Sequence, residues 1–458
     1  MERKSIKLNL FWARFCIILR KNSLQLFFVI YAFISPLSQV HASGTDYSFP
    51  ETYEIRREVT HLMTAPNKEI DNQRPMITDC FLTGKKVKFQ VVYDSGFYYF
   101  IFINERAILS QSEFPMVSAG TYVIKKDARS GAFTQIKIFL NNDPDTFVRI
   151  NSHNESSMLE FSLFKSMVCK EILIPISINK LITEPFETIM KLSDYIVNWD
   201  ILYTFYNETE NKLVMNICHE IDNKLPELND TEDGAQDWNG DFVFIENSEP
   251  NPEKGFNCSG FAKWVADGIF SAKTNRLMEI SALKKKHIPE RKDTLSLLYE
   301  NERDPFFGLD WTRNIAMTIY ELDNNEREIK FSDVDVRDYP YEVYSEEIGY
   351  SIANLKALLY YLTITNPGYI YLGSVNGDFG NDPVLRQHFH VVVFLPYIGP
   401  NGNFYPMVYE RNIKSSIDDF IKKYPRESIH LVRVKADDNF SLPDISALLD
   451  IPDSSEEE

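Results

Sequence analysis

Cysteine is scarce in this chain, which has five among 458 residues. The four that follow residue 42 are too few for the disulfide framework of a small secreted domain, and sequence alone leaves open whether any pair, such as Cys80 with Cys169, is bridged. There is also no Cys-x-x-Cys pair and no cluster of histidines and cysteines. We therefore expect no structural zinc, and no metal or other cofactor.

Basic residues are outnumbered by acidic residues beyond the N-terminus. The chain carries a formal charge of −18, and its first 42 residues contain six Lys or Arg and one Glu. The remainder therefore carries −23, which is −18 less the +5 of that segment. Since contacts to phosphates require Lys and Arg, we expect no binding to nucleic acid. Such a charge favours neutral or cationic substrates.

Long apolar runs are missing except near the N-terminus. Six basic residues up to Lys21 precede a mostly apolar run from Leu24 to Leu37, and Val40-His41-Ala42 has the small–x–small pattern of a cleavage site. The apolar run is shorter than the roughly 20 residues that span a bilayer. We interpret residues 1–42 as a signal peptide, with an uncleaved anchor as the alternative. The protein is then exported and is either periplasmic or secreted to the cell surface or beyond, and it contacts membrane only through this segment.

Residues 43–182 read as a β-rich domain. Short runs rich in aromatic and β-branched residues alternate with turn signals between about 85 and 178, and Asp94-Ser95-Gly96 between two such runs predicts a hairpin. Strands at this spacing favour a sandwich or a small barrel. No catalytic constellation is visible there, so a spacer or binding module is expected, with an envelope protein as its partner.

Residues 183–436 read as a second domain of mixed helix and strand. Helical periodicity covers about 184–199 and 211–224, and a helix-rich insertion at about 271–362 is expected to act as a lid or a specificity element. The acidic residues 437–458 are expected to form a disordered tail.

The stretch Gly255 to Phe270 carries the chemical signal. A glycine-containing loop runs into Cys258, and apolar residues then recur at helical spacing, so the cysteine should open a helix. The positive end of a helix dipole stabilises a thiolate and lowers the pKa of the thiol. Ser259 and Gly260 are small, and we expect them to leave the sulfur accessible and to bring backbone N–H groups close to a substrate carbonyl. A buried structural cysteine is the alternative interpretation.

A thiolate nucleophile needs a base, and two histidines open an apolar run that predicts a central strand. His390 is our candidate base, and His388, two residues earlier and expected on the same strand face, is the alternative. The run "FYPMVYERN" predicts the next strand and ends with Glu410 and Asn412, also two apart. A carboxylate or amide at this position would accept from the imidazole N–H and orient the ring.

These residues resemble a known family of cysteine peptidases. "NCSGFAKWV" resembles the nucleophile motif of the NlpC cell-wall peptidases, and "PGYIYLGSV" with "HFHVVVFLPY" resembles two of that family's strands. The stretch from His390 to Asn412 is also similar to the related CHAP amidases. The resemblance covers about a quarter of the chain. It implies an α+β, papain-like fold, with Cys258 as nucleophile, His390 as base, Glu410 as orienting carboxylate and Asn412 as an auxiliary polar group.

The expected function is therefore hydrolysis of an amide bond through an acyl-enzyme, with a peptide or the stem peptide or cross-link of peptidoglycan as substrate. Two alternatives remain open. One is a non-catalytic envelope-binding protein on a papain-like scaffold. The other is a cysteine-dependent acyltransferase, because one thioester intermediate serves both hydrolysis and transfer.

Overall fold

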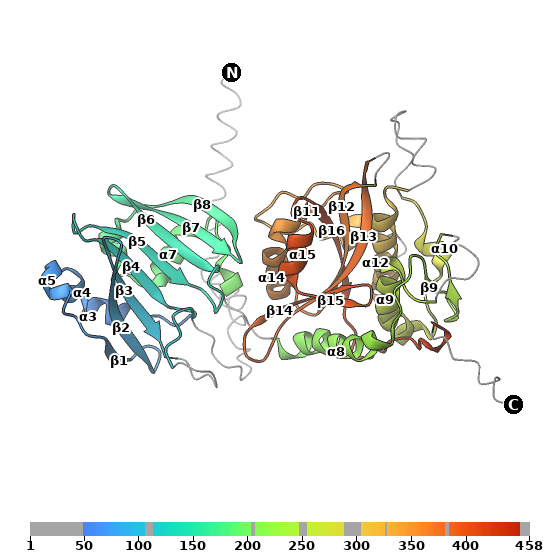
Figure 1. Cartoon of the computed structure of the whole chain (residues 1–458), viewed down its shortest axis with the longest axis horizontal. Helices are drawn as coiled ribbons and strands as arrows, with labels where there is room; N and C mark the ends of the chain where they lie inside the picture. Colours follow the sequence, from blue (N-terminus) through green and yellow to red (C-terminus); the bar gives the residue numbers. More distant parts are fainter. Residues whose placement is uncertain are drawn as a thin grey trace, which may run out of the picture. The chain divides into compact units, whose positions relative to one another are not determined.

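The structure is a computed structural model that describes residues 49–105, 113–202, 207–246, 254–287, 304–325, 328–380 and 384–448. Residues 47–458 form one compact unit, which contains two large antiparallel sheets (Figure 1). The predicted signal peptide lies outside the described residues. In the part that is described, no helix combines the length and the apolar character needed to cross a bilayer.

The first sheet is a meander in which eight strands pair in chain order. Ser95 and Gly96, at φ 51° and 85°, make the two-residue turn of the predicted hairpin. The strands are β1 (Met76–Cys80), β2 (Lys85–Asp94), β3 (Phe97–Asn104), β4 (Tyr122–Asp127), β5 (Phe133–Phe139), β6 (Phe147–His153), β7 (Ser156–Leu163) and β8 (Ser166–Ile174).

Short helices, not a second sheet, cover the apolar face of this meander. The side chain of Arg56 is fully buried, stacks on Tyr122 of β4 and donates to the carbonyl of Ile182. The expected sandwich is therefore wrong, and the described strands show no pairing of β1 with β8 that would close a barrel. The helices are α3 (Tyr53–Glu58), α4 (Thr60–Met63), α5 (Asn67–Ile70), α6 (Ile178–Leu181), α7 (Phe186–Ser193) and the 3-10 turn η1 (Trp199–Leu202). The predicted helix at 184–199 is thus limited to α7.

The second sheet has six strands in the order β11-β16-β12-β13-β14-β15. The run "HFHVVVFLPY" lies in β13, which pairs with β12 and β14 and is a central strand as predicted. The strands are β11 (Tyr350–Ser351), β12 (Tyr369–Phe379), β13 (Leu385–Ile398), β14 (Phe404–Glu410), β15 (Ile413–Ser415) and β16 (Ser428–Lys435). A separate pair, β9 (Ala235–Gln236) and β10 (Phe242–Val243), lies in the loop before Cys258.

Helices pack on both faces of this second sheet (Figure 1). One layer holds α8 (Glu208–Lys224), α9 (Cys258–Thr274) and α12 (Phe307–Asn324), and the other holds α14 (Leu355–Thr365) and α15 (Ile417–Lys423). Shorter elements are η2 (Leu225–Glu227), α10 (Ile280–Leu283), α13 (Phe331–Val334), η3 (Ile352–Asn354) and η4 (Ser446–Leu448).

Two expectations about this half need correction. The described part of the insertion is not a lid, because α12 and α14 supply core residues on opposite faces of the sheet, among them the fully buried Trp311. The tail is not disordered from residue 437 either. Phe440, Ile445 and Leu448 are buried in the same core as α9, since these apolar side chains outweigh the acidic character of their neighbours.

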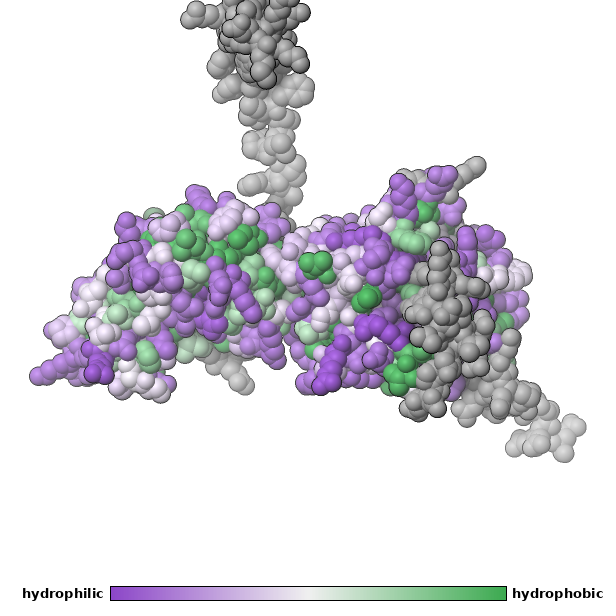
Figure 2. Space-filling view, turned by 90° about the horizontal axis from the view of Figure 1, so that it is seen from above, coloured by the Kyte–Doolittle hydropathy of each residue, from purple (hydrophilic) through white to green (hydrophobic). Residues whose placement is uncertain are grey.

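The face drawn in Figure 2 is mostly hydrophilic, as expected for a chain of this charge. Hydrophobic residues form separate patches on it, and the largest lies over the first sheet.

Candidate functional site

Cys258 is the first residue of α9, as the sequence predicts. Asn257 caps the helix, and its side-chain oxygen accepts the N–H of Gly260 at 2.8 Å. The predicted apolar stripe, with Phe261, Trp264 and Val265, is buried. The thiol therefore lies at the positive end of a 17-residue helix dipole, which favours its ionised form.

The loop before Cys258 is held by close backbone packing. A Cβ on Gly260 would lie 2.0 Å from the carbonyl oxygen of Gly234, which also accepts the N–H of Asn257 at 3.2 Å. Trp311 on α12 donates its indole N–H to the carbonyl of Ser259 at 3.0 Å. Gly234 and Trp311, from two distant segments, thus hold the backbone on either side of Cys258.

These contacts correct the role expected for Ser259 and Gly260. Ser259 is 3% exposed, and the N–H of Gly260 is engaged by Asn257, so these residues pack the helix start rather than open it. The N–H groups of Cys258 and Ser259 make no hydrogen bond among the described residues. They are the donors in this turn that remain for an oxyanion.

His390 and Glu410 meet where two strands stop pairing. The β13–β14 ladder ends at Val393 and Tyr409, and His390 and Glu410 lie just beyond it. The Nε2–H of His390 donates to Oε2 of Glu410 at 3.0 Å, and both side chains are about nine-tenths buried. Because Nε2 is engaged, the Nδ1 side of the ring is left for the thiol.

The thiol of Cys258 and the imidazole of His390 interact, because each group shifts the pKa of the other. Burial alone would raise the pKa of the Cys258 thiol, but the hydrogen bond and positive charge of His390 and the N–H of Val391 lower it below its ordinary value. Burial opposes the charge on His390, yet Cys258 and Glu410 raise the pKa of its imidazole to about 9. Burial likewise opposes the charge on Glu410, whereas His390 and Lys423 lower the pKa of that carboxyl to about 2. All three pKa shifts favour a thiolate on Cys258, an imidazolium on His390 and an ionised carboxylate on Glu410.

The other described cysteines behave differently. Cys80, Cys169 and Cys218 are free and buried, so the possible Cys80–Cys169 bridge is not formed. Burial raises the pKa of the Cys169 thiol to about 11 and that of the Cys218 thiol to about 12. A thiol held in its protonated form by burial is inert, so Cys258 is distinguished from these two by its environment.

His388 occupies the opposite side of the strand. Successive residues of β12 pair with the two histidines, Val375 with His390 and Asn376 with His388, so a bulge leaves Phe389 as an extra residue in β13. The same-face expectation is therefore wrong. His388 is buried, and its ring nitrogens contact the hydroxyl of Ser374 at 2.9 Å and the carbonyl of Glu347 at 2.8 Å.

Asn412 does not share a strand face with Glu410. β14 ends at Glu410, and Arg411 turns the chain with a φ of 56°. The Nδ2 of Asn412 donates to the carbonyl of Leu228 at 3.3 Å. Asn412 thus ties the turn after β14 to the loop that leads to Cys258, rather than acting on the imidazole.

Several residues at the site carry no signal in the sequence. Lys423, at the end of α15, donates to Oε2 of Glu410 at 2.8 Å, and Ser415 donates to its Oε1 at 3.1 Å. Arg411 binds both carboxylate oxygens of Asp230 through Nη1, at 2.9 and 3.0 Å. Only the fold brings these segments together, since each lies in an ordinary polar context in the sequence.

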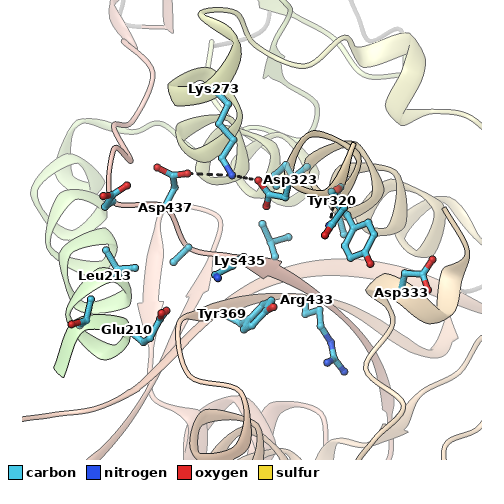
Figure 3. Close-up of a pocket in the computed structure, with 17 residues that line it drawn as sticks. Glu210, Leu213, Lys273, Tyr320, Asp323, Asp333, Tyr369, Arg433, Lys435 and Asp437 are labelled. Carbon is cyan, nitrogen blue, oxygen red and sulfur yellow. Dashed lines mark hydrogen bonds and ion pairs between the residues drawn. The ribbon is translucent and has the colours of Figure 1, made fainter. Parts of the chain in front are cut away.

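The structure also contains a cavity of about 690 Å³, which Figure 3 shows, and Cys258 is not among the residues that line it. Its wall includes Lys273, which forms ion pairs with Asp323 and Asp437 and lies near the other end of α9. Fifteen residues of helix correspond to roughly 22 Å, so this cavity is not part of the Cys258 site. Among the described residues, no group of three or more His, Cys, Asp or Glu is placed to hold a metal ion.

Comparison with known proteins assigns no activity to this site. Residues 45–201 match a family described as a domain of unknown function (DUF8515), which covers the first sheet and its helices but not Cys258. No curated protein and no solved structure matches the chain.

Proposed function

We propose that this protein is a cysteine-dependent hydrolase of amide bonds. The observation that carries the proposal is the arrangement of Cys258, His390 and Glu410, in which the thiol pKa is lowered even though burial opposes this. A structural cysteine would show the opposite direction, as Cys169 and Cys218 do.

The chemistry follows from these positions. The thiolate of Cys258 attacks the carbonyl carbon, and the N–H groups of Cys258 and Ser259 stabilise the negative charge that develops on its oxygen. The imidazolium of His390 then gives its proton to the leaving amine as the C–N bond breaks, which leaves a thioester. Water next attacks this thioester while His390 takes up a proton, and the thiolate is released with a carboxylic acid product.

Glu410 has a supporting role in this scheme. It accepts the Nε2–H of His390, so the ring is held in one orientation and Nδ1 is left for the sulfur. Its negative charge also stabilises the imidazolium during acylation.

The proposed substrate is a stem peptide or cross-link of peptidoglycan, met after export. The support is the sequence pattern of residues 1–42 and the resemblance of the Cys258 and His390 motifs to cell-wall peptidases. The acidic chain would not be attracted to nucleic acid or to an anionic membrane. The first sheet would serve to bind the wall or an envelope protein.

The test is turnover of purified cell-wall fragments by the protein and by Cys258→Ala, with Cys80→Ala as a second cysteine variant remote from the site. We expect release of new amino groups by the protein and by Cys80→Ala, and none by Cys258→Ala. An added amine that appears in the product would assign acyl transfer instead of hydrolysis. Equal inactivity of all three proteins on peptide amides, with no thiol reagent reacting at Cys258, would refute the enzymatic function.

A further inference from the structure

Lys423 and His390 share one oxygen of Glu410. The Nζ of Lys423 lies 2.8 Å from Oε2, and the Nε2 of His390 lies 3.0 Å from the same atom. Ser415 donates to Oε1 at 3.1 Å, so the carboxylate has three partners from three elements. Glu410 is 6% exposed, whereas more than half of the Lys423 side chain is exposed.

From this geometry we infer that Lys423 is a positioning residue that holds Glu410 and limits how strongly this carboxylate stabilises the imidazolium of His390. The inference rests on the proposed function, since it assigns a role around the same thiol and imidazole. Two donors on one oxygen divide its negative charge, and the cation of Lys423 also opposes a second positive charge beside it.

A limit on how strongly Glu410 stabilises the imidazolium suits the proposed reaction. His390 must give a proton to the leaving amine and later take one from water, so an imidazolium that is stabilised too strongly would be a poor acid. Removal of the Lys423 cation should therefore make the imidazolium harder to deprotonate. The pKa of His390 should rise, and the alkaline limb of the reaction should move to higher pH.

Other titratable or charged groups surround the thiol–imidazole pair on the neighbouring elements. Cys258 lies on α9, Glu410 ends β14, Arg411 follows it, and Tyr424 lies after α15 with its ring centroid 6.0 Å from that of His390. Lys423 differs from Arg411, because Arg411 is paired with Asp230 and not with the carboxylate that binds the imidazole.

The chain offers a matched control in the neighbouring lysine. Lys422 is also exposed and lies on the same helix, but it pairs with Asp419 at 3.1 Å and makes no contact with Glu410. Lys422→Met thus removes the same charge from the same helix without touching the shared oxygen.

The experiment measures the pH dependence of Cys258 alkylation by iodoacetamide in the full-length protein, Lys423→Met, Lys423→Arg and Lys422→Met. We expect the alkaline transition to move up by about 0.5 in pH in Lys423→Met, because the lysine is partly screened by solvent. Lys423→Arg and Lys422→Met should keep the original profile. Circular dichroism checks that each variant is folded.

The possible results distinguish the role of Lys423 from the activation of Cys258. An unchanged or lowered transition in Lys423→Met, or an equal shift in Lys422→Met, overturns the role of Lys423 while Cys258 remains activated. Alkylation of the unsubstituted protein with the pH dependence of an ordinary thiol would instead overturn the proposed function and this inference together.

Discussion

The imidazole of His390 donates to the carboxylate of Glu410 across 3.0 Å, at the point where the ladder between their strands has ended. The end of pairing matters because paired strands hydrogen-bond through their backbones and place their side chains on the two faces of the sheet. Beyond the last pair, side chains of both strands can meet one another and the thiol at the start of α9. The site is thus built where the sheet stops being regular.

Replacement of Glu410 by Gln should impair the base without removing the thiol. A neutral amide no longer stabilises the imidazolium, so the pKa of His390 should fall from about 9 and the alkaline limb of kcat/KM should move to lower pH. We expect kcat/KM to fall by about 100-fold or more. The pH–rate profile measures both effects, and Glu227→Gln on the surface is the control. A profile identical to that of the unsubstituted protein would remove Glu410 from the mechanism.

Replacement of Gly260 by Ala should displace the nucleophile. The new Cβ would lie 2.0 Å from the carbonyl oxygen of Gly234, so the backbone of the loop or the helix must shift. A displacement of about 1 Å costs on the order of 100-fold in rate. The rate of Cys258 alkylation at neutral pH measures the change. Gly402→Ala, in an open turn with φ 74°, is the control and should leave that rate unchanged. Equal rates in both variants would show that this close packing does not position the thiol.

The sequence predicts those site residues that lie in a local pattern, and it does not predict orientations that depend on a bulge or a turn. Cys258 was found because a helix start leaves a local pattern, and His390 because a buried central strand reads as an apolar run. The opposite orientation of His388 was missed because a bulge leaves no mark in an apolar run. The turn at Arg411, with a φ of 56°, also leaves no mark in the sequence, and it places Asn412 away from the strand face that carries Glu410.

In the fold, too, the local elements are predictable from the sequence, whereas the packing between distant segments is not. The strands of the first sheet follow from alternation and turn residues, which are local. Whether helices or a second sheet pack on the first sheet depends on contacts between distant residues, such as the stacking of Arg56 on Tyr122. The role of α12 depends on Trp311 reaching Ser259, 52 positions earlier in the chain. Local patterns do not contain these pairings.

A buried ion pair between α12 and the residue after α13 should matter for stability. Arg313 and Asp335 are both fully buried at the side chain, with Nη2 and Oδ2 2.9 Å apart. Arg313→Met would remove this partner from the buried carboxylate, which keeps Arg337 at 2.7 Å, and should lower the free energy of unfolding by about 1.5–3 kcal/mol. Urea denaturation at neutral pH measures the loss. The exposed pair of Lys191 and Glu187 offers a control, since Lys191→Met should cost less than about 1 kcal/mol. Equal losses in the two variants would contradict this account.

The acidic C-terminal segment should contribute to the core. Phe440 is 9% exposed and lies against Gly268 of α9, so Phe440→Ala should lower the free energy of unfolding by about 3 kcal/mol. Phe81, which is 93% exposed, provides a matched substitution that should cost almost nothing. Chemical denaturation of both variants measures the difference. A Phe440→Ala protein as stable as Phe81→Ala would mean that residues 437–448 do not pack on α9.

The central claim is that His390 activates Cys258, and the most direct measurement is the pH dependence of alkylation at each cysteine, mapped by mass spectrometry. Since the pKa of the Cys258 thiol is lowered, its thiolate persists to lower pH, and Cys258 should react at about pH 6 to 7 while Cys169 and Cys218 do not. In His390→Ala this reactivity should fall by about tenfold or more and follow the ordinary thiol pKa of about 8.5. Alkylation of Cys258 that is absent at neutral pH, or that is unchanged by His390→Ala, would contradict the account.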